Sequence, residues 1–330
     1  MKIPRILVVP IMFIIIVAIA FLVGLISYWL GAYNPSAVGF FTIIGIMGSF
    51  IVFIFGFSSI LGALCSLDAI PLVVYRMGLA ALGLAGYFVF FQRDNFKLHR
   101  SLWVKVLLGG LIIGVHWVTF FHAIKVAGVS LTLSMMATGA FLTAMLEPLV
   151  TRRRVLGYEL LFGGLIAFGV GLIFEAEYEH LYGIGIALIS AVLSSLFTIL
   201  NTELVKTAKA ITLSFYELAV GAVVGLLYVS LSSTYNLESF ELQQWDGLWI
   251  LLIAWLCTSY AFNISIKVMK HLSPFTVMMI INLEPVYGIA LSLAIWGEDE
   301  LMSFRFYLGF AIVLGAILLN GIYKRQKQIA

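Results

Sequence analysis

The sequence predicts an all-α polytopic membrane protein: a 5+5 inverted-repeat helix bundle with one extra hydrophobic helix at the N-terminus. Of its 330 residues, 62% are hydrophobic and only 11% are charged, and the mean hydropathy is +1.11. A soluble domain of this length could not cover its surface with so few charges. Two further observations support this fold: apolar runs of bilayer-spanning length fill the chain, and its two halves repeat.

The apolar runs are separated by short polar gaps. The longest gap, near residues 232–246, is too short to hold a catalytic domain. A spanning helix needs about 20 apolar residues, so the chain is filled by such helices and their loops. The predicted spans are residues 6–31, 38–62, 69–91, 102–123, 128–150, 155–174, 181–202, 211–232, 246–267, 273–296 and 303–323.

Basic residues alternate between the gaps that follow the span 38–62. Every second gap is basic, as at Arg152, Arg153 and Arg154, and the C-terminal tail is basic too. Each intervening gap holds at most one Lys or Arg. Because Lys and Arg concentrate on the cytoplasmic side, we expect an inner-membrane protein with a cytoplasmic C-terminus.

The first apolar run, residues 6–31, does not follow this alternation. As a spanning helix it would place Lys2 and Arg5 on the outer side, against the positive-inside rule. A cleaved signal peptide is the weaker alternative, because the run is long and no A-x-A site follows it. We therefore predict a retained extra helix in residues 1–36, with its orientation open.

The rest of the chain contains an internal repeat. Tyr75-Arg76 matches Tyr216-Glu217 at an offset of 141 residues, and matches at offsets of 142, 143 and 146 follow in order. Each half holds five spans, and because five is odd, the second copy enters the membrane from the opposite side. Inverted repeats are the usual plan of secondary transporters, with the site near the midplane. The predicted repeats are residues 37–178 and 179–330.

Several stretches resemble a known family. They are His116-Trp-Val-Thr-Phe-Phe-His-Ala-Ile-Lys125, Asn282-Leu-Glu-Pro-Val-Tyr-Gly288 and Ile295-Trp-Gly-Glu298, together with Arg76 in the second of the ten spans. Over residues 38–325 the chain resembles the EamA-type branch of the drug/metabolite transporter (DMT) superfamily. The resemblance implies a small-molecule permease, often an exporter of amino acids or related metabolites, with a central cavity between the halves. The extra helix departs from the usual ten spans.

Glu284 is the leading candidate for a substrate-binding residue. It lies near the middle of its predicted span, and ionisable groups inside a bilayer are usually functional and face a cavity. Pro285 removes a backbone donor, so a kink is expected there. The functional interpretation is a site for a substrate amine or a proton. The alternative is a protonated structural acid bonded across helices.

Other ionisable and aromatic side chains are candidates too. Arg76 suits a substrate carboxylate but could also reach toward the outer interface. Its repeat mate Glu217 would lie at the opposite depth, which makes a direct ion pair between them unlikely and suits two separate gates. His116 could relay a proton, and Trp117 could present its face to a cation, although packing is the alternative for both.

Polar residues within other spans complete the candidate set. Ser and Thr side chains often bond to their own helix backbone, so only some of these residues are expected to line a cavity. The remaining substrate-binding candidates are Ser195, Tyr260, Asn263 and Asn282.

The composition and motifs also disfavour several function classes. A net charge of +3 is too small to indicate nucleic-acid binding. The chain lacks a G-x-x-x-x-G-K-[ST] loop and the H-E-x-x-H and G-x-S-x-G motifs, which argues against ATP-driven transport and enzymatic activity.

We expect no cofactor and no metal site. The expected partners are a small-molecule substrate and the lipid bilayer, and a homodimer is possible. An intramembrane enzyme or a structural or sensory membrane protein is the alternative.

Overall fold

The computed structural model describes residues 35–151 and 157–329, so the predicted helix at 6–31 lies outside the described residues. Within the described ranges the chain forms helices and no strands, which confirms the all-α helix bundle. The main helices are α2 (Pro35–Leu64), α3 (Ala69–Phe91), α4 (Trp103–Met136), α5 (Gly139–Thr151), α6 (Gly157–Ala176), α7 (Leu181–Leu204), α8 (Ala210–Leu231), α9 (Asp246–Leu251), η5 (Leu252–Tyr260), α10 (Ala261–Met269), α11 (Pro274–Ile281), α12 (Glu284–Trp296) and α13 (Phe304–Ile329).

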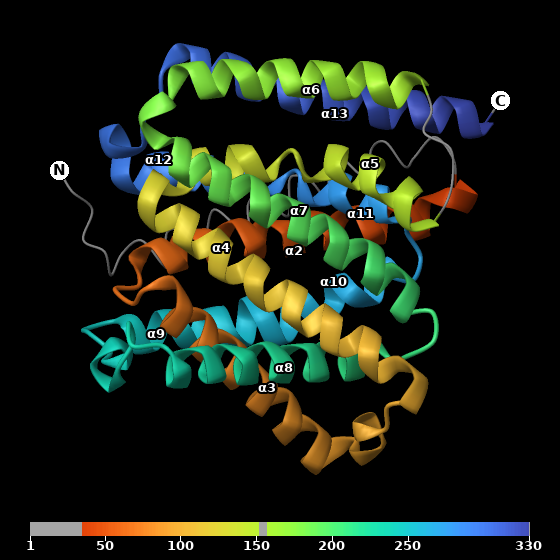
Figure 1. Cartoon of the computed structure of the whole chain (residues 1–330). Coiled ribbons are helices and arrows are strands. Elements are labelled where there is room, and N and C mark those ends of the chain that lie inside the picture. The colour runs from red at the N-terminus through yellow and green to blue at the C-terminus, as the bar shows by residue number, and fades with distance from the viewer. Residues whose placement is uncertain (1–34, 152–156, 330) are drawn as a thin grey trace.

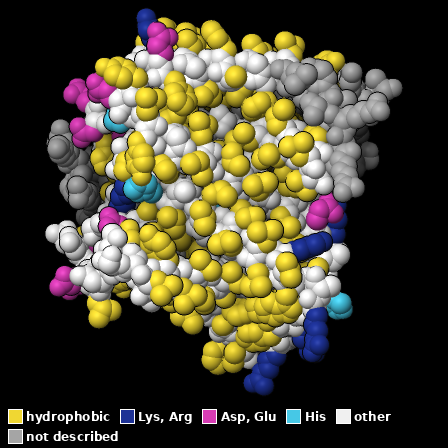
Figure 2. Space-filling model, viewed as in Figure 1, with side chains coloured by type: hydrophobic (Ala, Val, Ile, Leu, Met, Phe, Trp, Pro, Cys, Tyr) yellow, Lys and Arg dark blue, Asp and Glu magenta, His cyan; other side chains and the backbone are white. Residues whose placement is uncertain are grey.

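Six helical segments of the described residues are long and apolar enough to cross a membrane: 69–91, 100–136, 178–204, 210–231, 246–269 and 274–300. Four shorter apolar helical segments lie at 50–64, 139–150, 161–176 and 304–316. Figure 2 shows a broad belt of hydrophobic side chains across the visible face, with charged side chains gathered mainly toward its two ends. The protein is therefore a multi-pass membrane protein.

The helices run back and forth along the bundle. The connections after α3, α7 and α10 lie toward one end, where α13 also ends, and those after α2, α6, α8 and α12 lie at the other (Figure 1). Within the bundle, α3 packs against α8, α4 against α7, and α6 against α13. The helix α2 packs against α12, η5 and α10.

The predicted span 128–150 is not one helix, which corrects the sequence-based expectation. The chain is helical from Trp103 to Met136, but Gly128 interrupts this segment with φ 81° and ψ 168°. A side chain is strained at such a φ, so glycine suits the position. A second interruption at Ala137 and Thr138 separates α4 from α5.

The predicted span 273–296 is also interrupted. The first part, α11, begins after Ser273, whose hydroxyl accepts a hydrogen bond from the Thr276 backbone N–H at 3.3 Å. The helix ends at Ile281, and α12 begins at Glu284 with Pro285 in its first turn. Proline is well tolerated in a first turn because it lacks an N–H group that would have no partner there. The expected disturbance is therefore present, but it precedes Pro285.

The predicted span 246–267 contains a π-helix, η5, between α9 and α10. The Thr258 hydroxyl donates to the Ile253 carbonyl at 2.8 Å, five residues back along the chain. A π-helical turn adds a residue to the helix and shifts the side chains that follow, and such turns are frequent at functional sites. Here the shift brings Thr258 to the interior, where it is fully buried.

Glycines allow close contacts between helices, and α4 and α8 each contain a GxxxG sequence. Gly114 of α4 lies against Gly221 of α8, and a Cβ at Gly114 would be 3.3 Å from the Gly221 Cα. A similar contact joins α6 and α13, where a Cβ at Gly169 would lie 2.8 Å from the Gly309 carbonyl oxygen. Small residues at these crossings let the two backbones approach each other.

We expect Gly169→Ala to lower the free energy of unfolding by roughly 1–3 kcal/mol, because its methyl group would overlap the α13 backbone. Gly171→Ala is the matched control on the same helix, since nothing lies within 4 Å of a Cβ there. Thermal unfolding in detergent measures both. Equal melting temperatures for the two variants would contradict the close α6–α13 contact.

Candidate functional site

A cavity lies in the interior of the bundle, beside the α11–α12 interruption. Its volume, counted as space open to the centres of water molecules, is about 80 Å³, enough for several waters. Aromatic rings make up much of its wall, including Phe55, Trp117, Phe120, Phe197 and Phe262. Three ionisable side chains also line it: Arg76, His116 and Glu284. An apolar wall with a few converging polar groups is the usual character of a small-molecule site.

Arg76 of α3 is held rigidly at the cavity wall and is only 3% exposed. Its Nε donates to the Thr258 hydroxyl at 2.8 Å, and its Nη1 donates to the Ser58 hydroxyl at 3.2 Å. Its Cζ lies 3.8 Å from the centroid of the Trp117 ring, a cation–π contact. The guanidinium group is therefore buried and does not reach to the outer interface, which was the alternative for this residue.

Glu284 enters the same cavity from the first turn of α12. The N-terminal end of a helix favours a negative charge because of its unpaired N–H groups and dipole. Arg76 attracts Glu284 electrostatically, yet in the described part of the chain no hydrogen bond or ion pair joins them. A cation and a carboxyl group thus share one cavity, and each remains open to a further partner.

His116 of α4 is fixed by Ser190 of α7. Its Nδ1 lies 2.8 Å from the Ser190 hydroxyl oxygen and 3.0 Å from the Ser190 carbonyl oxygen. The Ser190 hydroxyl also lies 3.0 Å from the His116 carbonyl oxygen. These contacts fix the orientation of the imidazole ring, which forms part of the cavity wall. They also connect α4 to α7.

The structure brings four of the nine predicted residues to this cavity: Arg76, His116, Trp117 and Glu284. It does not bring the other five there. Glu217 is fully buried between α4, α7 and α8, and Asn282 is buried at the α11–α12 interruption. Ser195 donates to the Gly139 carbonyl at 3.0 Å. Tyr260 and Asn263 line a separate, shallower depression between α3 and the η5–α10 segment.

Two further residues make structural contacts that were not predicted from the sequence. Ser58 bonds to Arg76 from α2, and its only sequence signal is a hydroxyl within an apolar run. Glu300 accepts hydrogen bonds from the backbone N–H groups of Val129 and Ser130 at 3.0 and 2.9 Å. It thereby caps the helix that begins after Gly128, across a separation of about 170 residues.

The comparisons with known proteins agree with this architecture. The model of the EamA-like transporter family matches residues 181–322, the segment from α7 into α13. This part of the chain is similar to the EamA-like transporter family. The EamA resemblance inferred from motifs is thereby confirmed. We found no match among curated proteins.

Solved structures support the fold over a longer stretch than the EamA match. One crystal structure superposes with a TM-score of 0.59 at 13% sequence identity, and the match covers 86% of this chain and 97% of the other. At this identity the likeness shows a shared fold and nothing about substrate. The shared fold reaches beyond the segment that the family model matches and covers most of the chain.

We expect Trp117→Leu to lower the free energy of unfolding by at least about 1 kcal/mol, because it removes the ring beneath Arg76 and a buried packing surface. Trp255→Leu is the control, since Trp255 is 54% exposed on the bundle surface and changes there are usually small. Thermal unfolding compares the two variants. A larger loss in Trp255→Leu would contradict the cation–π contact at the cavity.

Proposed function

We propose that the protein is a permease that moves a small polar metabolite, such as an amino acid, through the central cavity by alternating access. The observation that carries this proposal is the pairing of Arg76 and Glu284 at one aromatic-walled cavity without a direct bond between them. A guanidinium group recognises a carboxylate, and a carboxylate recognises an ammonium group. The cavity is thus complementary to both ends of an amino acid.

The EamA-like match supports transport as the activity of the fold. The cavity lining includes Ser265 and Met269, near the end of α10 where the basic gap at Lys270 follows. With the orientation expected from the basic gaps, this end faces the cytoplasm. We therefore propose loading from the cytoplasm, as in an exporter, in an inner membrane with the C-terminus inside.

Alternating access would come from the two proposed repeats, residues 37–178 and 179–330, moving against each other. Paired contacts support this division. The hydroxyl of Tyr75 donates to the Phe240 carbonyl at 3.1 Å, and that of its repeat mate Tyr216 donates to the Phe96 carbonyl at 2.7 Å. Each tyrosine thus contacts the loop between the second and third helices of the opposite half.

The two tyrosine contacts lie at opposite ends of the bundle. This arrangement suits two contacts that would break alternately, each opening one end. The Phe240 loop follows α8 and the Phe96 loop follows α3, and these connections lie toward opposite ends of the bundle (Figure 1). At the Phe240 end, Asp246 accepts hydrogen bonds from the Ser66 backbone and hydroxyl at 2.9 and 2.5 Å. We propose that these bonds hold the outer end closed.

We expect proteoliposomes preloaded with a mixed pool of amino acids and small metabolites to release one class of solute. Glu284→Gln should abolish this flux because it removes the charge that would recognise an ammonium group. Glu203→Gln is the control, since Glu203 is an exposed carboxylate outside the cavity, paired with Lys206. Flux is measured by mass analysis of the external solution.

The outcomes of this flux assay separate the two parts of the proposal. Equal flux in wild type and Glu284→Gln would leave transport standing and overturn the assignment of the binding site. The absence of flux for every solute in the pool, with folded protein in the membrane, would overturn transport of this solute class.

A further inference from the structure

Glu217 occupies a buried position that the central cavity does not use. It lies on α8, is fully buried, and faces α4 at two glycines. A Cβ at Gly109 would lie 2.5 Å from the Glu217 Oε1, and a Cβ at Gly110 would lie 2.7 Å from its carbonyl oxygen. Gly109 therefore leaves the space that the carboxyl group fills, and Gly110 lets the α8 backbone approach α4.

Asn201 of α7 is the hydrogen-bond partner of Glu217. Its Nδ2 donates to the Glu217 Oε1 at 2.9 Å. Each side chain then has one buried oxygen without a partner in the described part of the chain: Oε2 of Glu217 and Oδ1 of Asn201. Buried polar atoms are nearly always hydrogen-bonded. Two unpaired oxygens on side chains that are hydrogen-bonded to each other therefore require an explanation.

The charge environment of Glu217 argues against an ionised carboxylate. No charged side chain interacts with it from the described parts of α3, α4, α7 or α10; Asn201 is its polar neighbour. A buried carboxylate without a basic partner or further donors is strongly unfavourable. One proton removes the charge and also turns an acceptor oxygen into a donor.

We propose that Glu217 is a proton-binding site, occupied in this conformation, whose Oε2–H donates to the Asn201 Oδ1. The two side chains then form a closed pair of hydrogen bonds, as a carboxylic acid and a primary amide do. A single added proton gives a hydrogen-bond partner to both of the unpaired oxygens. Rotating the Asn201 amide by half a turn exchanges the roles of its two atoms, and the paired arrangement still needs that proton.

A role for the Glu217 proton in transport rests on the proposal that the protein is a permease. Glu217 is enclosed by α4, α7 and α8, so its proton can reach water only when these helices separate. Alternating access supplies such a movement, because α4 belongs to one proposed repeat and α7 and α8 belong to the other. Binding and release of this proton would then be linked to the change between states.

Infrared spectroscopy of the full chain tests the protonation directly, without knowledge of the substrate. We expect the wild-type protein at neutral pH to show absorption from a protonated carboxyl group that Glu217→Gln removes. The glutamine amide can form both hydrogen bonds with Asn201, so this variant should keep the wild-type melting temperature. Loss of folding in Glu217→Gln would itself contradict the paired arrangement.

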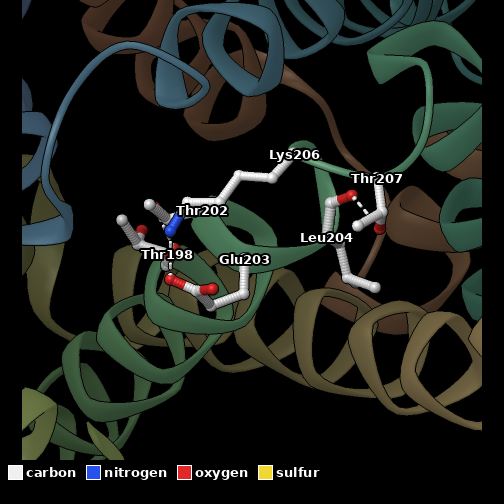
Figure 3. Close-up of polar contacts among 6 residues, drawn as sticks. All are labelled: Thr198, Thr202, Glu203, Leu204, Lys206 and Thr207. Carbon is white, nitrogen blue, oxygen red and sulfur yellow. Dashed lines mark hydrogen bonds and ion pairs between the residues drawn. The ribbon is translucent and has the colours of Figure 1, made fainter.

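The control variant is Glu203→Gln on the same segment as Asn201. Figure 3 shows Glu203 and Lys206 joined near the end of α7, and their ion pair measures 2.6 Å between exposed side chains. Because Glu203 is exposed and paired with Lys206, its replacement should leave the protonated-carboxyl absorption unchanged. Asn201→Ala provides a second test: it should retain the Glu217 absorption but shift it, because the acceptor is lost.

A spectrum in which Glu217→Gln removes no protonated-carboxyl absorption at neutral pH would overturn the proposal. It would mean that Glu217 is ionised and that a buried water or cation satisfies the two oxygens. This result is separate from the outcome of the flux assay: a protein without flux could still show the Glu217 absorption, and a transporter could lack it.

Discussion

The need to satisfy every backbone polar group inside the bilayer governs this structure. Lipid offers no hydrogen bonds, so a helix can be interrupted only where protein or a cavity supplies partners. The interruptions at 137–138 and 282–283 both meet this condition in the interior. The Ser195 hydroxyl bonds to the Gly139 carbonyl beside the first, and Glu284 enters the cavity at the second. Met136 and Glu284, which adjoin the two interruptions, both line the cavity.

The same constraint explains how the buried polar groups are held. Arg76 is tolerated in an apolar interior because Thr258, Ser58 and the Trp117 ring surround its guanidinium group. Glu300 is tolerated because two backbone N–H groups at the start of a helix bind it. Glu217 lacks partners of this kind, which is the reason to assign it a proton. Each buried group is thus stabilised by a different physical means.

Hydropathy is a local property of the chain, and it predicted where the apolar segments lie from residue 38 onward. It did not show that the segments 128–150 and 273–296 are each interrupted. Gly139 and Glu284 are 145 residues apart, within the range of the repeat offsets, and they begin α5 and α12, the helices that follow the two interruptions. The interruption at 137–138, the π-helix and the Asn201–Glu217 bond could not be predicted, because they depend on contacts between distant segments. Glu300 was missed for the same reason: nothing near it in sequence identifies Val129 as its partner.

Access of a water-soluble thiol reagent to the cavity tests the central claim most directly. In a chain with Cys65 and Cys257 replaced, Ser194→Cys places a thiol on the cavity wall, and Ser195→Cys places one at a fully buried neighbour outside it. We expect the reagent to label position 194 and not position 195, and the transported solute to protect position 194. Equal labelling of both positions, or labelling of 194 that no transported solute reduces, would contradict a central solute pathway.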